Sequence, residues 1–311
     1  MSERSPDRPT RFKRPTLLIV GCGDVGLRAA GLLIGRWRVV ALTSSRERVA
    51  ELRAAGIVPL VGDLDRPATL ARLADLADAV LHLAPPATEG ARDDRTSHLV
   101  RALARSMRLR RLVYGSTTGV YGDCQGARVD ETRPLRPASD RARRRVDAEA
   151  RVRWFGRATG VAVTILRIPG IYALDRDGGD PRERVKRGTP LLAAGDDVYT
   201  SHIHADDLAR ACVAALHRGP HPRAINVADD TVMTMGDYFD HVADRFGLPR
   251  PPRLSRDDAA RVLSPMQMSF LSESRRIANA RMKAELRLVL RHPTVVEGLS
   301  RVPPELGRGG K

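Results

Sequence analysis

The chain of 311 residues is long enough for one large α/β domain with a smaller lobe, or for two domains. Its formal net charge is +16, and the basic residues are almost all arginine. Because they are spread along the chain and no nucleic-acid-binding motif accompanies them, we expect no specific nucleic-acid binding. The absence of a run of about 18 apolar residues argues against a membrane span, and three cysteines without a CxxC pair favour the reducing cytoplasm.

The first 170 residues alternate between apolar runs and helical patterns. Residues 1–15 are polar and predict a disordered tail. The repeated strand–helix alternation that follows predicts a parallel sheet with helices on both faces. The expected strands span 16–21, 38–43, 58–63, 79–85, 111–117 and 161–169, and the expected helices span about 25–35, 46–56, 67–76, 92–106 and 140–158.

After residue 171 the pattern becomes irregular, although a helix is expected at 206–217 and a strand at 224–229. The fold class that we predict is therefore α/β, a Rossmann-type doubly wound parallel sheet with a small C-terminal substrate lobe. The predicted domains are the sheet domain over 16–170, a mixed lobe over 171–300 that returns to the sheet, and a tail over 301–311.

A glycine-rich hexapeptide, GCGDVG, lies between the first strand and the first helix. Gly21 permits a tight turn, Gly23 lets a pyrophosphate approach the backbone, and Gly26 lets helix and strand pack closely. The helix N-terminus then faces the phosphates. The pattern alone is weak, but this position makes it predict a dinucleotide-binding turn. Its predicted cofactor-binding residues are Gly21, Cys22, Gly23, Asp24, Val25 and Gly26.

The end of the second strand carries Thr43, Ser44 and Arg46, where an NAD-binding protein usually has an acidic residue. Hydroxyl groups and a guanidinium suit a 2′-phosphate, and no carboxylate is there to repel it. We therefore expect NADP in preference to NAD; the alternative is that Arg46 is a solvated residue of the helix. Asp63, after the third strand, is expected either to accept a bond from the adenine amino group or to cap the next helix.

Several segments occur in an order that resembles the extended short-chain dehydrogenase/reductase superfamily, in its NAD-dependent epimerase/dehydratase branch. The resemblance covers about residues 16–300 and implies an NAD(P) cofactor, a small-molecule substrate of the carbonyl or nucleotide-sugar type, and a homodimer. It adds Leu64, Leu83 and Ala84 to the cofactor site. The segments are GCGDVG, GDL (62–64), HLAPP (82–86), YGSTTGVYGD (114–123), LRIPGIYALDR (166–176), HIHADDLA (202–209), NVADD (226–230) and residues 274–299.

The resemblance also implies a mechanism in which a tyrosine, a lysine four residues later and a strand-end hydroxyl act beside the nicotinamide. Thr117 matches the hydroxyl. The stretch PASDRARRRVDAE (137–149) has Arg141 at the tyrosine position and Arg145 at the lysine position, and no tyrosine occurs between residues 122 and 171. Arginine cannot act as a general acid or base. Arg145 can still donate bonds to a ribose or phosphate; the alternative is a solvated helix surface.

Other residues of the chain are candidates for the missing proton donor and for substrate contacts. Tyr121 and Tyr172 lie in segments that border the substrate cleft in the family, so either is a candidate donor. Thr118, Tyr172 and Arg276 are the expected substrate contacts.

Two histidines, His202 and His204, alternate on an expected strand and precede Asp206. We expect no metal there, and we expect Asp206 to be the N-cap of the following helix.

Three functions remain open. The first is an NAD(P)-dependent oxidoreductase or epimerase with a non-standard proton donor. The second is a non-catalytic dinucleotide-binding sensor or assembly protein of the atypical members of this superfamily. The third is a nucleic-acid-associated protein that uses its basic surface.

Overall fold

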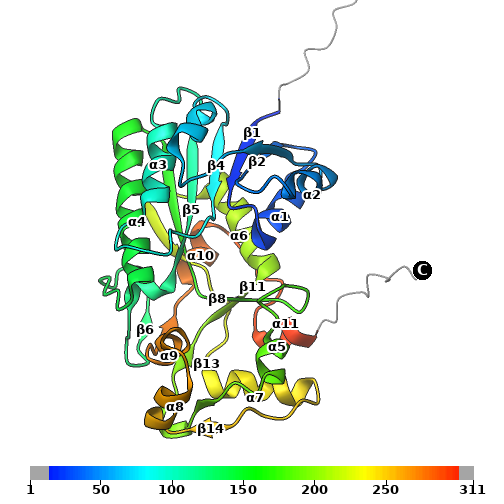
Figure 1. The fold of residues 1–311 in the computed structure, drawn as a ribbon, viewed down its shortest axis with the longest axis vertical. Coiled ribbons are helices and arrows are strands. Elements are labelled where there is room, and N and C mark those ends of the chain that lie inside the picture. Colours follow the sequence, from blue (N-terminus) through cyan, green and yellow to red (C-terminus); the bar gives the residue numbers. More distant parts are fainter. Residues whose placement is uncertain (1–13, 301–311) are drawn as a thin grey trace, which may run out of the picture.

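A seven-stranded sheet forms the centre of the computed structural model, which describes residues 14–300 (Figure 1). Its order is β12-β7-β5-β4-β1-β2-β3, and every neighbouring pair is parallel. The predicted Rossmann-type doubly wound sheet is confirmed. The strands are β1 Thr16–Val20, β2 Arg38–Thr43, β3 Val58–Val61, β4 Ala79–His82, β5 Arg111–Thr117, β7 Ala162–Ile168 and β12 Arg223–Asn226.

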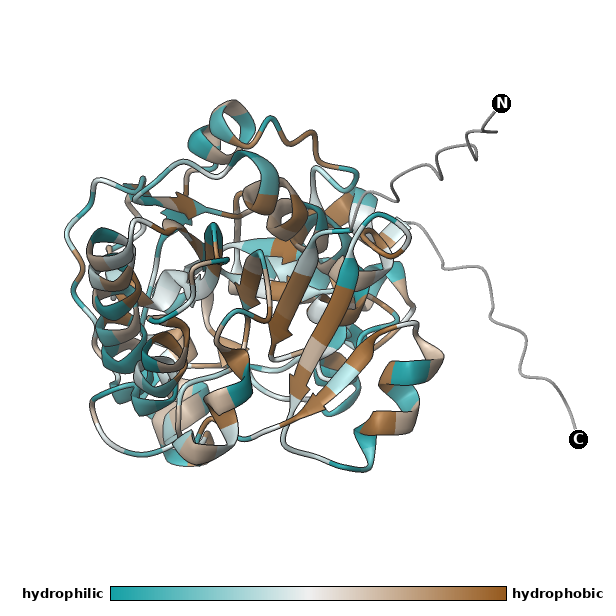
Figure 2. Ribbon diagram, turned by 90° about the horizontal axis from the view of Figure 1, so that it is seen from above, coloured by the Kyte–Doolittle hydropathy of each residue, from teal (hydrophilic) through white to brown (hydrophobic). Residues whose placement is uncertain are grey.

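Helices cover both faces of the sheet, because alternate residues of the apolar strands point to opposite sides. Leu17 and Ile19 of β1 belong to one buried cluster, while Leu18 and Val20 belong to the other. In Figure 2 the strands are coloured apolar and lie inside the polar outer helices. The helices beside the sheet are α1 Asp24–Gly31, α2 Arg48–Ala54, α3 Asp94–Leu103, α4 Asp140–Thr159, α6 Ala205–Arg218 and α10 Ala280–Glu285, with 3₁₀ helices at Pro67–Leu73 and Thr118–Tyr121.

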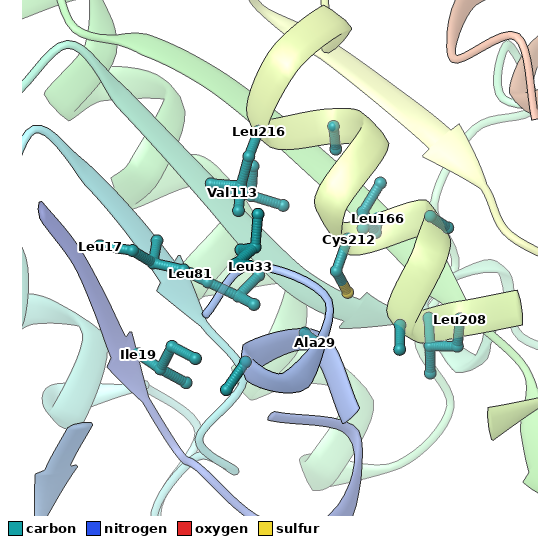
Figure 3. Close-up of a cluster of buried hydrophobic side chains, with 14 of the residues drawn as sticks. Leu17, Ile19, Ala29, Leu33, Leu81, Val113, Leu166, Leu208, Cys212 and Leu216 are labelled. Atoms are coloured by element: carbon teal, nitrogen blue, oxygen red, sulfur yellow. The ribbon is translucent and has the colours of Figure 1, made fainter. Parts of the chain in front are cut away.

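Helix α6 packs on the same face of the sheet as α1, although the two are far apart in sequence. Figure 3 shows Leu208, Cys212 and Leu216 of α6 directed toward the strands that carry Val113 and Leu166. The segment beyond residue 171 thus supplies both a helix and the edge strand β12 to the sheet.

The smaller lobe is built from short strand pairs and helices around a third buried cluster, which includes Leu191, Tyr238 and Phe239. β8 (Gly170–Tyr172) pairs with β11 (His202–His204) and leads the chain from the sheet into this lobe. The other short strands are β6 Arg128–Val129, β9 Leu191–Leu192, β10 Tyr199–Thr200, β13 Met233–Thr234, β14 Arg253–Leu254 and β15 Arg276–Ile277, and the helices are α5 Pro181–Lys186, α7 Met235–Arg245, α8 Arg256–Val262, α9 Pro265–Leu271, α11 Val295–Ser300 and a 3₁₀ helix at Ala194–Asp196.

Apolar residues occur at a spacing of four in the helix 140–158, as Ala142, Val146, Ala150 and Trp154, and this spacing predicts a single apolar face. The structure confirms only its first half: Ala142 is buried and Val146 packs against a buried cluster, but Ala150 is exposed and Trp154 is 60% exposed. A strict spacing of four advances about 40° per step around a helix, so such residues wind away from the core. Ala148, Val152 and Phe155, at spacings of four and three, are the residues that pack on the sheet.

Element boundaries differ from the expected ones by a few residues. The expected strand 79–85 ends at His82, and the expected helix 67–76 is a 3₁₀ helix at Pro67–Leu73. The predicted tails, 1–15 and 301–311, lie outside the described residues except for positions 14 and 15. In the described part of the chain, no helix is long and apolar enough to cross a membrane.

Candidate functional site

The glycine-rich turn lies where the strand order reverses, between β1 and β4, which is the point where open α/β sheets bind ligands. Gly21 has a φ of +87°, and a Cβ at this position would collide with the backbone of Ala84. A Cβ on Gly26 would lie 3.1 Å from the oxygen of Gly21. Gly23 differs, since its Cβ would meet no atom within 4 Å. The backbone at Gly23 is therefore open to a ligand.

The N-terminus of α1 begins at this turn. Its N-cap residue is Gly23, which provides no side-chain bond to the helix N–H groups. These donors and the helix dipole suit an anion such as a pyrophosphate. Asp24 does not leave a free negative charge beside them, because its carboxylate is bound by Arg28 and Arg176.

Residues expected at the adenosine end lie at the carboxyl ends of β2 and β3. Thr43 is buried and its hydroxyl bonds to the backbone of Ser45, while Ser44 is exposed. Arg46 is exposed and forms no ion pair with any described residue. The guanidinium of Arg46 is thus free to meet a phosphate.

Asp63 does not cap a helix. Its Oδ1 accepts a bond from the N–H of Asp65, and the N-cap of the following 3₁₀ helix is Arg66. Of the two roles expected for Asp63, helix capping is therefore wrong. The neighbouring Leu64 is buried.

Leu83 and Ala84 follow β4 and close the turn from the opposite side. Both of their N–H groups donate to the oxygen of Val20, at 2.7 and 3.0 Å. The cofactor residues expected from four separate segments thus meet at the carboxyl ends of β1 to β4.

Thr117 ends β5 and lines a cavity of about 680 Å³ between the sheet and the lobe. Its hydroxyl accepts a bond from the N–H of Gly119 at 3.2 Å, and Thr118 lines the same cavity. Arg141 enters the cavity from the first turn of α4, with its guanidinium carbon 5.1 Å from the centre of the Phe270 ring. Arg141 forms no ion pair within residues 14–300.

Arg145 lies one helical turn later and points to the ends of β4 and β5. Its Nη1 donates to the hydroxyl of Tyr114 at 3.0 Å and to the oxygen of Gly115 at 2.8 Å. The guanidinium is therefore held beside the strand ends and is not a free surface charge. Its other nitrogens have no hydrogen-bond partner among the described residues.

Tyr121 does not line the cavity. It is 1% exposed, its hydroxyl donates to Oδ1 of Asn226 at 2.7 Å, and it accepts from Nη1 of Arg167 at 2.9 Å. Burial raises the pKa of Tyr121, which makes it a weaker acid. The structure therefore gives this side chain a packing role.

Tyr172 lines the cavity, but its hydroxyl donates to the oxygen of Thr294 at 3.4 Å. Burial raises the pKa of this phenol as well. His202 is also in the cavity wall, and burial lowers its pKa to about 3, so it is neutral near pH 7. The pKa values of Tyr121, Tyr172 and His202 are therefore all shifted away from neutral pH, which makes these side chains poor proton donors or acceptors there.

Arg276 lies outside the cavity. Its Nε donates to the oxygen of Gly126 at 2.7 Å, and its guanidinium lies over the Tyr199 ring. The adjacent Arg275 lines the cavity instead and pairs with Glu273. Adjacent residues of an extended chain point in opposite directions. The expected substrate contact is therefore displaced by one residue, from Arg276 to Arg275.

Sequence reasoning missed the lobe side of the cavity. Arg176 of the loop after β8, Arg184 of α5 and Phe239 of α7 all line it. The only signal in the sequence was a cluster of arginines between residues 176 and 187, which is indistinguishable from a solvated helix surface.

His204, Asp206 and His292 bring three potential metal ligands within 4.8 Å of one another. The two imidazole rings are stacked, with centroids 3.7 Å apart, and Asp206 pairs with Arg28 at 2.6 Å. Metal bonds lie in the plane of an imidazole, so stacked rings direct their lone pairs side by side and not toward one point.

The prediction that Asp206 is the N-cap of α6 is wrong. His204 is the N-cap, and its side chain accepts a bond from the N–H of Asp206.

Asp229 is a buried carboxylic acid in the segment after β12. Burial raises its pKa to about 7, and the nearby charges of Asp230 and Asp207 raise it further. One carboxylate oxygen has no hydrogen-bond partner. In the unfolded chain the pKa of Asp229 is near 4, so the free energy of unfolding decreases as the pH rises from about 4 to about 7.

We expect Asp229→Asn to increase the free energy of unfolding at about pH 8, and we expect this gain to shrink toward about pH 5.5. Urea unfolding across this range tests it; a gain independent of pH would contradict the prediction.

Comparison with known proteins extends these observations. A family model described as "NAD dependent epimerase/dehydratase family" matches residues 17–228. Protein YeeZ of Escherichia coli strain K12 is 32% identical over 245 residues, which cover 75% of this chain and 84% of YeeZ.

Two solved structures are similar over most of their length. A functionally unknown conserved protein from Silicibacter pomeroyi has a TM-score of 0.78 at 32% identity and covers 92% of this chain and 97% of its own. UDP-glucose 4-epimerase from Thermotoga maritima, solved with UDP-glucose, has a TM-score of 0.75 at 20% identity and covers 91% and 96%. At this identity the second similarity shows a shared fold.

The family model spans more than half of the chain, and YeeZ shares almost a third of its residues over three quarters of it. The resemblance to the NAD-dependent epimerase/dehydratase branch, inferred from the ordered motifs, is confirmed. This protein belongs to the NAD dependent epimerase/dehydratase family.

Proposed function

We propose that this protein binds NADP(H) in preference to NAD(H) and acts as an oxidoreductase or epimerase on a substrate of the carbonyl or nucleotide-sugar type. The observation that carries the proposal is the open backbone at Gly23, at the N-terminus of α1 and at the sheet's switch point. The turn is shaped for a pyrophosphate. Thr117, at the end of β5, lines the cavity that we take as the substrate site.

In this proposal, other residues of the chain take over the role of the family's catalytic tyrosine, which this sequence lacks. A bound nicotinamide supplies or accepts hydride. Arg141 and Thr117 line the same cavity and can stabilise negative charge on a substrate oxygen, which is electrostatic catalysis. In this proposal neither side chain exchanges the proton that accompanies hydride transfer; the substrate oxygen exchanges it with solvent water. Arg145, held at the ends of β4 and β5, can bind a ribose hydroxyl with its remaining nitrogens.

A second function, a non-catalytic dinucleotide-binding sensor or assembly protein, is favoured by a separate observation. The Tyr-x-x-x-Lys pair is absent, and the phenols of Tyr121 and Tyr172 have raised pKa values. Such a protein would hold a dinucleotide tightly but transfer no hydride.

Calorimetry with NADPH, NADP⁺, NADH and NAD⁺, followed by a panel of carbonyl compounds and nucleotide sugars, separates these functions. Binding together with a change in nicotinamide absorbance supports the enzyme. Binding with no turnover across the panel supports the sensor. A chain that binds none of the four dinucleotides would overturn both.

The cofactor preference is tested by Arg46→Asp. We expect this variant to bind NADPH about tenfold or more weakly, because a carboxylate replaces a guanidinium near the 2′-phosphate, and to bind NADH as well as or better than the parent. Arg53→Asp on the following helix is the matched control for the change in surface charge. An unchanged ratio of the two affinities in the Arg46 variant would refute the NADP preference.

We also propose a homodimer and a cytoplasmic location. Support for the dimer comes from the outer helix α4, where Trp154 is 60% exposed. Support for the location comes from Cys22, Cys124 and Cys212, which are all free thiols.

A further inference from the structure

A groove lies at the amino ends of the sheet strands, at the opposite edge of the sheet from the glycine-rich turn. Its volume is about 1020 Å³, and Arg14, Arg38 and Arg108 line it together with apolar residues. Thr16 and Arg38, which begin β1 and β2, are neighbours across the two strands. Figure 1 shows the start of β1 at the end of the molecule away from the smaller lobe. The groove is therefore separate from the dinucleotide turn and from the substrate cavity.

Three apolar side chains line this groove and keep part of their surface in contact with water. Ile34 is 44% exposed and Val58 is 41% exposed. The Trp37 ring is half-buried and makes an edge-to-face contact with His217, with 5.8 Å between the ring centroids. Covering such a surface with another apolar side chain is favourable, because it removes apolar area from water. The groove can therefore hold an apolar side chain of a partner.

The charge around the apolar surface is positive and poorly compensated. Arg108 pairs with Asp78 at 2.7 Å, whereas Arg14 and Arg38 form no ion pair within residues 14–300. No acidic residue is among the described residues that line the groove. Arg36, beside it in the chain, is exposed and also forms no ion pair in that range. The groove therefore attracts anionic groups.

Charge also distinguishes between the candidate occupants of the groove. Residues 1–13 and residues 301–311 each contain more basic than acidic residues, and the whole chain has a net charge of +16. Charge repulsion therefore disfavours both ends of this chain and a second copy of it. A nucleic acid matches the arginines, but the aliphatic Ile34 and Val58 offer no aromatic face on which a base could stack. An acidic protein segment with apolar side chains matches both the charge and the apolar surface.

We propose that this groove is a docking site for an acidic protein segment that carries apolar side chains. Carboxylates of the segment pair with Arg14 and Arg38. An apolar side chain of the segment packs on Ile34, Trp37 and Val58. A partner bound there leaves the carboxyl ends of the strands open, so the inference does not depend on the proposed function.

The random copolymer poly(Glu,Tyr) is the probe, because it combines carboxylates with aromatic side chains, and poly-Glu of the same length lacks the apolar part. Fluorescence anisotropy of the labelled polymers measures their binding to the full chain at low ionic strength. We expect the parent to bind poly(Glu,Tyr) about tenfold or more tightly than poly-Glu. The double variant Arg14→Glu/Arg38→Glu should bind poly(Glu,Tyr) about tenfold or more weakly than the parent, because attraction becomes repulsion.

Arg245→Glu on the smaller lobe is the matched control for the reversal of charge. Arg245 is exposed and forms no ion pair with a described residue, so we expect its reversal to change the affinity for poly(Glu,Tyr) about twofold at most. Ile34→Ser tests the apolar contact separately. It should weaken the binding of poly(Glu,Tyr) about fivefold and leave the binding of poly-Glu unchanged.

The double variant should keep the melting temperature and the NADPH affinity of the parent, because Arg14 and Arg38 are exposed and lie away from the glycine-rich turn. A loss of polymer binding is then a property of the groove. The proposal is overturned if the parent binds neither polymer, if it binds both equally, or if the double variant binds poly(Glu,Tyr) as the parent does. A short single-stranded RNA that binds more tightly than poly(Glu,Tyr), and loses its affinity in the double variant, would assign the groove to nucleic acid and also overturn the proposal.

Discussion

Gly23→Val is expected to weaken dinucleotide binding about a hundredfold or more while leaving the free energy of unfolding almost unchanged. The new side chain meets no protein atom within 4 Å of its Cβ, so the fold accommodates it. It projects instead into the space at the N-terminus of α1 where a pyrophosphate would contact the backbone. A hundredfold loss corresponds to about 2.7 kcal/mol of binding free energy. Calorimetry with NADPH and urea unfolding of the same preparation measure the two effects.

Gly21→Val is the matched control, two residues away in the same turn. Its Cβ would collide with the backbone of Ala84, and its φ of +87° disfavours any β-branched residue. We expect this variant to lose stability by several kcal/mol or to fail to fold. If Gly23→Val bound NADPH as tightly as the parent, the turn would not be the dinucleotide site.

Glu149→Gln should lower the free energy of unfolding by about 3–5 kcal/mol. Glu149 and Arg167 form an ion pair at 2.8 Å, with side chains only 2% and 3% exposed. Ser116 donates a further hydrogen bond to the same carboxylate at 2.8 Å. Removing the negative charge leaves the buried guanidinium of Arg167 without an ionic partner. Urea unfolding near pH 7 gives the difference.

The control for Glu149→Gln is Asp140→Asn, at the start of the same helix. Asp140 pairs with Arg143, but both side chains are at least half exposed, so we expect a loss of about 1 kcal/mol or less. Equal losses in the two variants would show that burial of the Glu149–Arg167 pair is energetically unimportant.

The network around Glu149 also holds the hydroxyl of Tyr121, which does not line the cavity. Arg167 bonds to both Glu149 and the Tyr121 hydroxyl, and Asn226 accepts from that hydroxyl. These residues come from β7, α4, the 3₁₀ helix after β5, and β12. The family motif places Tyr121 beside the substrate cleft, but the partners that turn it away are up to 105 residues distant.

The dinucleotide half of the candidate site could be predicted in some detail. The parallel, doubly wound sheet follows from the alternation of apolar runs and helices, and the turn at Gly21 requires a residue that tolerates a positive φ. Both are local properties, so a single sequence reveals them. Helix α4 was harder, because its apolar residues are few and its arginines occupy both buried and exposed positions, as Arg144 and Arg143 show.

The substrate half depends on contacts between distant segments. The sequence does not show whether an arginine is paired with a carboxylate. Arg182 and Arg184 are two residues apart, yet Arg182 pairs with Asp180, whereas Arg184 lies against Phe239, 55 positions later, and forms no ion pair among the described residues. Local sequence can be read for elements, for the glycine turn and for the absence of the tyrosine and lysine. The burial, pairing and direction of each charged side chain are set by the packing of the lobe on the sheet, because the cost of an unpaired charge depends on what surrounds it.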